Sequence, residues 1–138
     1  MGTIDQEYLQ ESIEQFLSEA NCLKTYTHCI TVGDYAYKLA EQFMVDPDKA
    51  QIAGYLHDIS AVYPDDQRVE IANKMGIALY KEEIVLPMII HQRMSKEIAI
   101  SQFNINDPEI LSAIECHTTL KGNYSILDLV VFIADKIK

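Results

Sequence analysis

The chain has 138 residues, of which 49% are hydrophobic and 23% charged, the proportions of an ordinary globular protein and not of a disordered chain. A formal net charge of −10 argues against nucleic acid and against anionic membrane surfaces as general partners. At this length we expect a single domain over residues 1–138, with a core large enough to fold unaided.

Apolar residues recur at a spacing close to 3.6 along most of the chain, and this period predicts helices rather than strands. In chain order, helices are expected over residues 5–20, 26–44, 47–57 and 66–75, then from 87 through at least 103, over 108–117, and from 126 through at least 135. Asp46 and Asp107, each followed by proline, and Ser125 are the expected N-terminal caps. Gly76 is the expected end of the fourth helix. The fold class is therefore all-α, a helical bundle whose first helix occupies roughly the first 20 residues.

All four histidines can be assigned to one metal site together with two aspartates. The candidate ligands are His28, His57, Asp58, His91, His117 and Asp135. They are spread over nearly the whole chain, so the fold and not a local loop would have to assemble the site. Imidazole and carboxylate donors suit divalent Fe, Mn, Zn, Co or Ni better than Ca or Mg. Because such a metal activates water near neutral pH, hydrolysis is the first hypothesis.

The adjacent pair His57–Asp58 lies where the third helix is expected to end. Within a regular helix, neighbouring side chains diverge by about 100°, whereas at a helix end both can reach inward. The Asp58 carboxylate can also bridge two ions, which makes it the expected catalytic residue. The expected ligand sets are His28, His57, Asp58 and Asp135 for one ion, and Asp58, His91 and His117 for the other. Taken singly, each histidine is more often an ordinary surface or core residue, so the hypothesis depends on the whole set.

The residues around these ligands form two recognisable sequence motifs, AGYLHDI over residues 53–59 and FIADKI over residues 132–137. From about Lys24 onward, the chain resembles the HD-domain phosphohydrolases, and among them the YqeK-like branch, which cleaves diadenosine tetraphosphate symmetrically to two ADP. The resemblance implies an HD-domain helical bundle, a nucleotide substrate and two divalent metal ions. Iron is the metal that it implies, while ligand spacing alone does not separate iron from manganese.

Cleavage of a phosphoanhydride needs cations or hydrogen-bond donors at the phosphates that do not react. Residues of these types close to the proposed ligands are the candidates for substrate binding: Arg93, Thr118, Lys121 and Lys136. The alternative for each of them is an ordinary solvated surface residue.

Four features depart from the family pattern. Ala61 stands where the family often has a lysine, Thr25 where it commonly has an arginine, and residues 120–124 where it often has a glycine-rich turn. These departures concern substrate charge more than the metal ligands. Family members also continue beyond the position of Asp135 with helical sequence that is absent from this chain, and that tail could cover the site or a homodimer interface.

Two alternatives stay open beside the tetraphosphate hydrolase. The same chemistry could act on a nucleoside monophosphate or a guanosine polyphosphate alarmone, or the chain could be a metal-containing nucleotide sensor without useful turnover. Three cysteines without CxxC spacing indicate reduced thiols. With neither a secretion signal nor an apolar run long enough to span a bilayer in the sequence, we expect a cytoplasmic protein.

Overall fold

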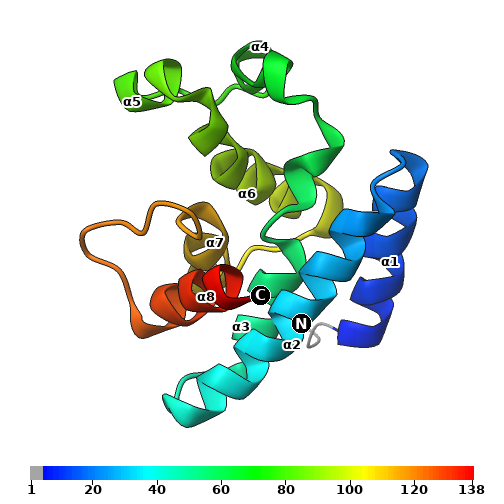
Figure 1. Cartoon of the computed structure of the whole chain (residues 1–138), viewed down its shortest axis with the longest axis vertical. Coiled ribbons are helices and arrows are strands. Elements are labelled where there is room, and N and C mark those ends of the chain that lie inside the picture. Colours follow the sequence, from blue (N-terminus) through cyan, green and yellow to red (C-terminus); the bar gives the residue numbers. More distant parts are fainter. Residues whose placement is uncertain (1–4) are drawn as a thin grey trace.

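The computed structural model describes residues 5–138, and the fold of this part of the chain is all-α, with helices and no strands, as predicted (Figure 1). Its α-helices are α1 (Gln6–Glu19), α2 (Leu23–Gln42), α3 (Pro47–Leu56), α4 (Arg68–Lys74), α5 (Lys81–Val85), α6 (Ile90–Phe103), α7 (Pro108–Glu115) and α8 (Ile126–Ile137). Short 3-10 helices are η1 (Ile59–Val62), η2 (Asp65–Gln67) and η3 (Pro87–Ile89). Among the helices between residues 5 and 138, none is both long and apolar enough to cross a bilayer.

The predicted helix caps are confirmed. Asp46 and Asp107 each accept a hydrogen bond from the backbone N–H two residues later, at the starts of α3 and α7. The Ser125 side chain accepts from the backbone N–H of Asp128, whose carboxylate accepts from the backbone N–H of Ser125, a reciprocal capping box. Gly76 follows α4 with a φ of 80°, a conformation that glycine adopts without strain.

Some elements differ from the prediction, among them the helix expected from residue 87, whose first turn is η3 while α6 begins at Ile90. Helix α2 begins at Leu23, three residues earlier than expected, and the segment 66–75 is divided into η2 and α4. Helix α5 was not predicted at all. Five residues are too few to show a helical period, and α5 is held instead by the Glu83 carboxylate, which accepts a hydrogen bond from the backbone N–H of Tyr80 at 2.8 Å.

Helices α2 and α3 cross at two glycines. A Cβ atom on Gly54 would lie 2.6 Å from the Cα atom and 2.9 Å from the backbone nitrogen of Gly33. The ring of Tyr55 covers Gly33, and its hydroxyl donates to a carboxylate oxygen of Asp34 at 2.7 Å. This close approach brings α2, which carries His28, against the helix that ends just before the His57–Asp58 pair.

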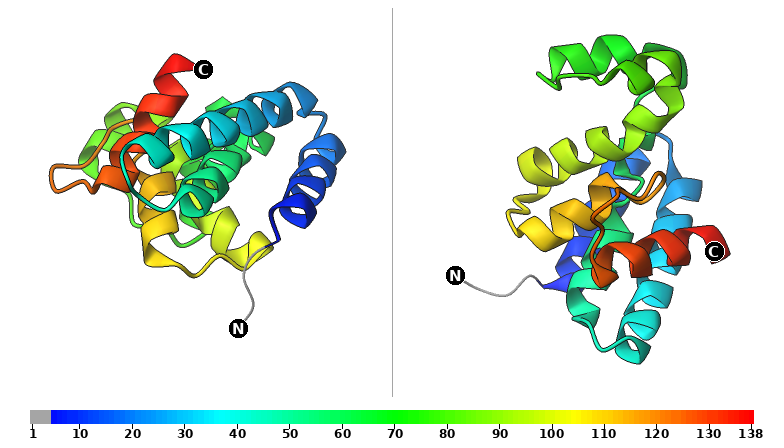
Figure 2. Two further views of the ribbon diagram at one scale, coloured as in Figure 1. Left: turned by 90° about the horizontal axis from the view of Figure 1, so that it is seen from below. Right: turned by 90° about the vertical axis from the view of Figure 1, so that its left-hand side faces the viewer.

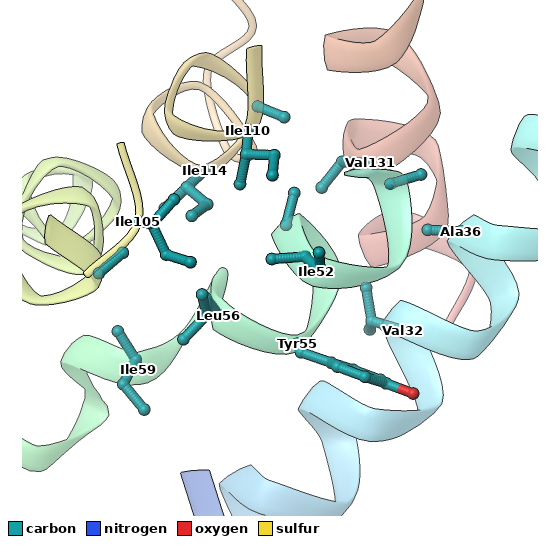
Figure 3. Packing of buried hydrophobic residues seen from close by; sticks show 14 of the residues in the cluster. Val32, Ala36, Ile52, Tyr55, Leu56, Ile59, Ile105, Ile110, Ile114 and Val131 are labelled. Atoms are coloured by element: carbon teal, nitrogen blue, oxygen red, sulfur yellow. The ribbon is translucent and has the colours of Figure 1, made fainter. Parts of the chain in front are cut away.

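The main hydrophobic core lies among α2, α3, α7 and α8 (Figure 3), and α1 and α6 also contribute buried side chains to it. Its aliphatic side chains include Val32, Ile52, Leu56, Ile110, Ile114 and Val131. Each of them is at most 4% exposed, and full burial of such a side chain stabilises the fold by about 1.5–3 kcal/mol. Helices α4 and α5 lie apart from α1 at one end of the molecule (Figures 1 and 2). There α4 packs against α6 through a smaller cluster of buried residues, Ala72, Ile77, Ile90 and Met94. The large core therefore supports the helices that carry the predicted ligands.

Candidate metal centre

The structure brings all six predicted ligands together from five helices or their ends. Three overlapping groups form, in each of which one donor atom per residue lies within 4.8 Å of the others. They are His28–His57–Asp58, His57–His117–Asp135 and Asp58–His91–His117. His28 lies in α2, His91 in the first turn of α6 and Asp135 in α8, while His57 and His117 lie just beyond the ends of α3 and α7.

The adjacent pair reaches one site because the helix ends between its two residues. His57 keeps a helical backbone, with φ −60° and ψ −29°, whereas Asp58 has left it, with φ −119° and ψ 22°. The Asp58 side chain makes no capping hydrogen bond to η1, which begins at the next residue. Its carboxylate belongs to two of the three donor groups, which is the position that a bridging ligand needs.

Three of the histidines are oriented in the same way. The Nδ1 atoms of His57, His91 and His117 lie 2.6, 2.5 and 2.8 Å from the carbonyl oxygen of the residue three positions earlier. A carbonyl oxygen only accepts, so each Nδ1 donates, and in the neutral ring Nε2 is then left with its lone pair. Backbone carbonyls are common outer partners of metal-binding histidines, because they fix the tautomer and the orientation of the ring.

The Nε2 atoms converge on one another. Those of His91 and His117 are 3.1 Å apart, and those of His28 and His57 each lie 3.2 Å from the same carboxylate oxygen of Asp135. Two facing nitrogen lone pairs repel unless a proton or a cation lies between them. The donor set therefore fits divalent metal ions of the kind that histidine and carboxylate ligands bind.

Burial and mutual proximity set the charges of this cluster in the absence of metal. Burial alone would lower the pKa of His57, but its interactions with Asp135, Cys29 and Asp58 together outweigh burial and raise it. Burial and the nearby His57 and His91 hold the pKa of His117 well below its ordinary value. Although burial opposes it, the interactions with His57 keep the pKa of Asp135 well below its usual range. A proton on His57 thus stands where a cation would bind, and metal binding would release it.

Two buried serines, which sequence reasoning missed, tie the His57–Asp58 segment to α6. The backbone N–H of Ser60 donates to the hydroxyl of Ser95 at 3.1 Å, and the hydroxyl of Ser60 donates to the carbonyl oxygen of His91 at 2.9 Å. Both serines are at most 1% exposed. In the sequence they are common polar residues with no motif, so only their burial identifies them.

A cleft of about 580 Å³ lies beside the cluster, between α5, α6 and the segment after α7. The histidines do not line it, but their neighbours Gln92, Cys116 and Thr119 do. Of the predicted substrate-binding residues, Arg93 and Lys121 line this cleft. Thr118 and Lys136 are not part of its lining.

Thr118 and Lys136 are placed differently from each other. The Thr118 hydroxyl lies 3.0 Å from Nε2 of His91, directly at the donor cluster. The Lys136 ammonium lies 4.9 Å from the centre of the Phe132 ring and makes a cation–π contact there. A role of Lys136 in substrate binding stays a prediction.

The two cations of the cleft already have partners. Arg93 donates to the Glu83 carboxylate at 2.6 Å and to the carbonyl oxygen of Ala78 at 2.9 Å, and its guanidinium lies over the ring of Tyr80. Lys121 donates to a serine hydroxyl at 2.5 Å and lies 3.9 Å from a buried aspartate. Arg93 therefore has a structural role, whatever it also does for a substrate.

We expect Arg93→Ala to lower the free energy of unfolding by roughly 3–5 kcal/mol, because it leaves the buried Glu83 carboxylate without its cationic partner. The Glu83 side chain is only 4% exposed. Adding Glu83→Gln should recover part of the loss, and urea denaturation of the single and double variants measures both effects. Lys74→Ala, which breaks an exposed pair with Glu70, is the control, with an expected change below about 0.5 kcal/mol. An Arg93→Ala protein as stable as the wild type would contradict this role.

Comparison with known proteins gives consistent results. The family model described as HD domain matches residues 25–138. The chain is 56% identical over 93 residues, or 67% of its length, to "Uncharacterized protein in pepC 5'region" of Lactococcus lactis subsp. cremoris. It is 32% and 30% identical, over 83% and 82% of its length, to proteins of Staphylococcus aureus and Bacillus subtilis that are each named symmetrical bis(5'-nucleosyl)-tetraphosphatase. The chain spans 48%, 59% and 60% of the lengths of these three relatives.

A similar solved structure comes from Clostridium acetobutylicum and is described as a predicted HD superfamily hydrolase involved in NAD metabolism. The TM-score is 0.83, with 32% sequence identity, and the match covers 99% of this chain and 70% of that one.

Proposed function

Because this chain belongs to the HD domain family, we propose that it is a metal-dependent phosphohydrolase that cleaves diadenosine tetraphosphate symmetrically, adding water across the central anhydride to give two ADP. The convergence of six side chains with histidine or carboxylate donors is the observation that carries the proposal of metal-dependent hydrolysis. The choice of substrate is supported by the names of relatives that are 30–32% identical to this chain.

Two overlapping ligand sets would hold the metal. His28, His57 and Asp58 would form the first set with Asp135, whose carboxylate lies 3.2 Å from both His28 and His57, and Asp58, His91 and His117 would form the second. We propose divalent iron, with manganese as the alternative, since both accept imidazole and carboxylate ligands. Bound ions of this kind lower the pKa of water and neutralise charge on phosphoryl oxygens.

The side chains around the ligands would orient the substrate. Asp58, common to both sets, would accept a hydrogen bond from the attacking water and so aim it at phosphorus. The hydroxyl of Thr118, next to His91, would donate to an oxygen of the phosphoryl group under attack. Arg93 and Lys121 would face the phosphates that do not react. Each has N–H groups beyond those that bind its present partners, and these would donate to phosphate oxygens.

The cleft beside the centre would hold one nucleoside of the substrate. Its volume of about 580 Å³ lies within the range of roughly 300–1,000 Å³ typical of small-molecule sites. Tyr80 and Ile89 give it apolar walls for a base, while the hydroxyl of Thr119 supplies a polar group. We also propose a cytoplasmic place of action, which suits a protein whose three cysteines are all unpaired.

One observation favours a second candidate function. Arg93 and Lys121 both lie close to carboxylates, which reduces the positive charge available to phosphates in the cleft. A metal-containing nucleotide sensor with little turnover would tolerate that arrangement better than an enzyme would.

The deciding experiment is hydrolysis of diadenosine tetraphosphate by protein purified without chelator, with metal content determined on the same sample. We expect ADP as the sole product and close to two ions per chain. A chelator should abolish turnover, and Fe²⁺ or Mn²⁺ should restore it. ATP and AMP as products would rule out symmetrical cleavage. Bound metal without turnover of any nucleotide would favour the sensor.

A further inference from the structure

Gln92 is a buried amide whose polar atoms are all directed at one short segment. It follows His91 in α6 and is 7% exposed. Its Oε1 atom accepts from the backbone N–H groups of Thr118 and Thr119 at 3.0 and 3.3 Å, and its Nε2 atom donates to the hydroxyl of Thr119 at 2.6 Å. One side chain thus makes three hydrogen bonds to the residues that directly follow His117.

The segment held in this way lies outside any helix. Helix α7 ends at Glu115, so residues 117–119 lack the regular backbone hydrogen bonds that would fix them within a helix. Buried or half-buried backbone N–H groups require partners, and two of those in this segment find theirs on Gln92. The position of the segment relative to α6 therefore depends on this amide.

The contact joins the two halves of the second ligand set. His91 precedes Gln92 on α6, and His117 precedes Thr118 and Thr119, to which Gln92 is hydrogen-bonded. The Nε2 atoms of His91 and His117 are 3.1 Å apart, and the hydroxyl of Thr118 lies 3.0 Å from Nε2 of His91. The first ligand set is built differently, because His28 and Asp135 lie within α2 and α8, whose own backbone bonds hold them.

We infer that Gln92 is a positioning residue for the second metal ion: it holds His117 and Thr118 against His91, so that retention of this ion depends on the amide while retention of the first ion does not. The inference rests on the proposed two-ion centre. In this role Gln92 contacts neither the metal nor the substrate.

The test is titration of metal-free protein with Co²⁺, followed by the visible absorption of the bound ion, for wild type and Gln92→Leu. Leucine keeps the size of the side chain and removes all three hydrogen bonds. We expect two binding events in the wild type. In the variant, affinity should fall for one of them alone, by roughly 10–100-fold, as when outer partners of metal ligands are removed.

Two further variants separate positioning from general damage. Gln92→Glu keeps both acceptor contacts, and the hydroxyl of Thr119 can turn to donate to the carboxylate, so this variant should retain both ions. Gln51→Leu removes another amide that hydrogen-bonds to side chains, those of Gln6 and Asp34, away from the centre, and should also bind two ions.

Equal loss of both ions in Gln92→Leu, or no loss of either, would overturn the inference. Wild-type protein that binds fewer than two ions would instead refute the two-ion centre itself, and the inference with it. Circular dichroism checks that each variant folds. If Gln92→Leu does not fold, Thr119→Val removes only the contact of the amide donor and should show the same selective loss to a smaller extent.

Discussion

Asp58→Ala is expected to abolish metal retention and turnover together. The carboxylate of Asp58 is the one group that lies with His28 and His57 on one side and with His91 and His117 on the other. Its loss removes a ligand from both sets at once. The fall in metal affinity should exceed about a hundredfold, the upper end of the losses seen when outer partners of a ligand are changed.

The variant should fold, because Asp58 makes no capping hydrogen bond and three of the histidines keep their bonds to backbone carbonyls. Metal analysis of dialysed protein, together with the rate of hydrolysis of diadenosine tetraphosphate, measures both losses. Asp48→Ala is the matched control. It removes the same charge from the exposed first turn of α3, and it should change neither metal content nor rate. Hydrolysis by Asp58→Ala at the wild-type rate would refute the proposed mechanism.

Gly54→Ala is expected to destabilise the fold severely, with a loss in free energy of unfolding at or above the roughly 1–3 kcal/mol typical of overpacked cores. The added Cβ would meet backbone atoms of Gly33, at 2.6 and 2.9 Å, and not a flexible side chain. The two helices must therefore separate. Since α2 carries His28 and α3 leads into His57, metal affinity should fall with stability. Urea denaturation measures the first effect and metal titration the second.

Gly122→Ala is the control for that substitution. An added Cβ at Gly122 has no heavy atom within 4 Å, and its backbone does not have the positive φ that disfavours alanine. This variant should be as stable as the wild type, or more stable by about 0.4–1 kcal/mol because the unfolded chain loses freedom. Equal effects of the two substitutions would show that the helix crossing tolerates a methyl group.

The sequence was sufficient to predict the helical fold, the caps and the set of donors that meet in space, because these depend on local chemistry and on distinctive residue types. Asp46, Asp107 and Ser125 cap helices through contacts within three residues, which a sequence displays directly. The bend at His57–Asp58 was predictable because two adjacent ligands require a helix end.

What sequence reasoning missed depends on contacts between distant residues. Gln92 reaches a segment 26 and 27 positions away, and Ser60 meets Ser95 35 positions away. Such pairs carry no periodic or motif signal. Likewise, the partners of Arg93 are a carboxylate and a carbonyl on an unpredicted short helix and the segment before it. The sequence predicts Arg93 as a substrate-binding cation, and the structure adds an ion pair with Glu83 that the sequence does not indicate.

Because the donor residues are far apart in the sequence, a bound metal would also stabilise the fold. His28 and Asp135 are 107 positions apart, yet they meet at one carboxylate oxygen, so a bound ion would fasten α2 to α8 as a crosslink does. A ligand that binds only the folded chain, present at a hundred times its dissociation constant, adds about 2.7 kcal/mol to stability. Metal starvation would then act on the lifetime of the protein as well as on its chemistry. Chains without bound metal would unfold more often and would be degraded first.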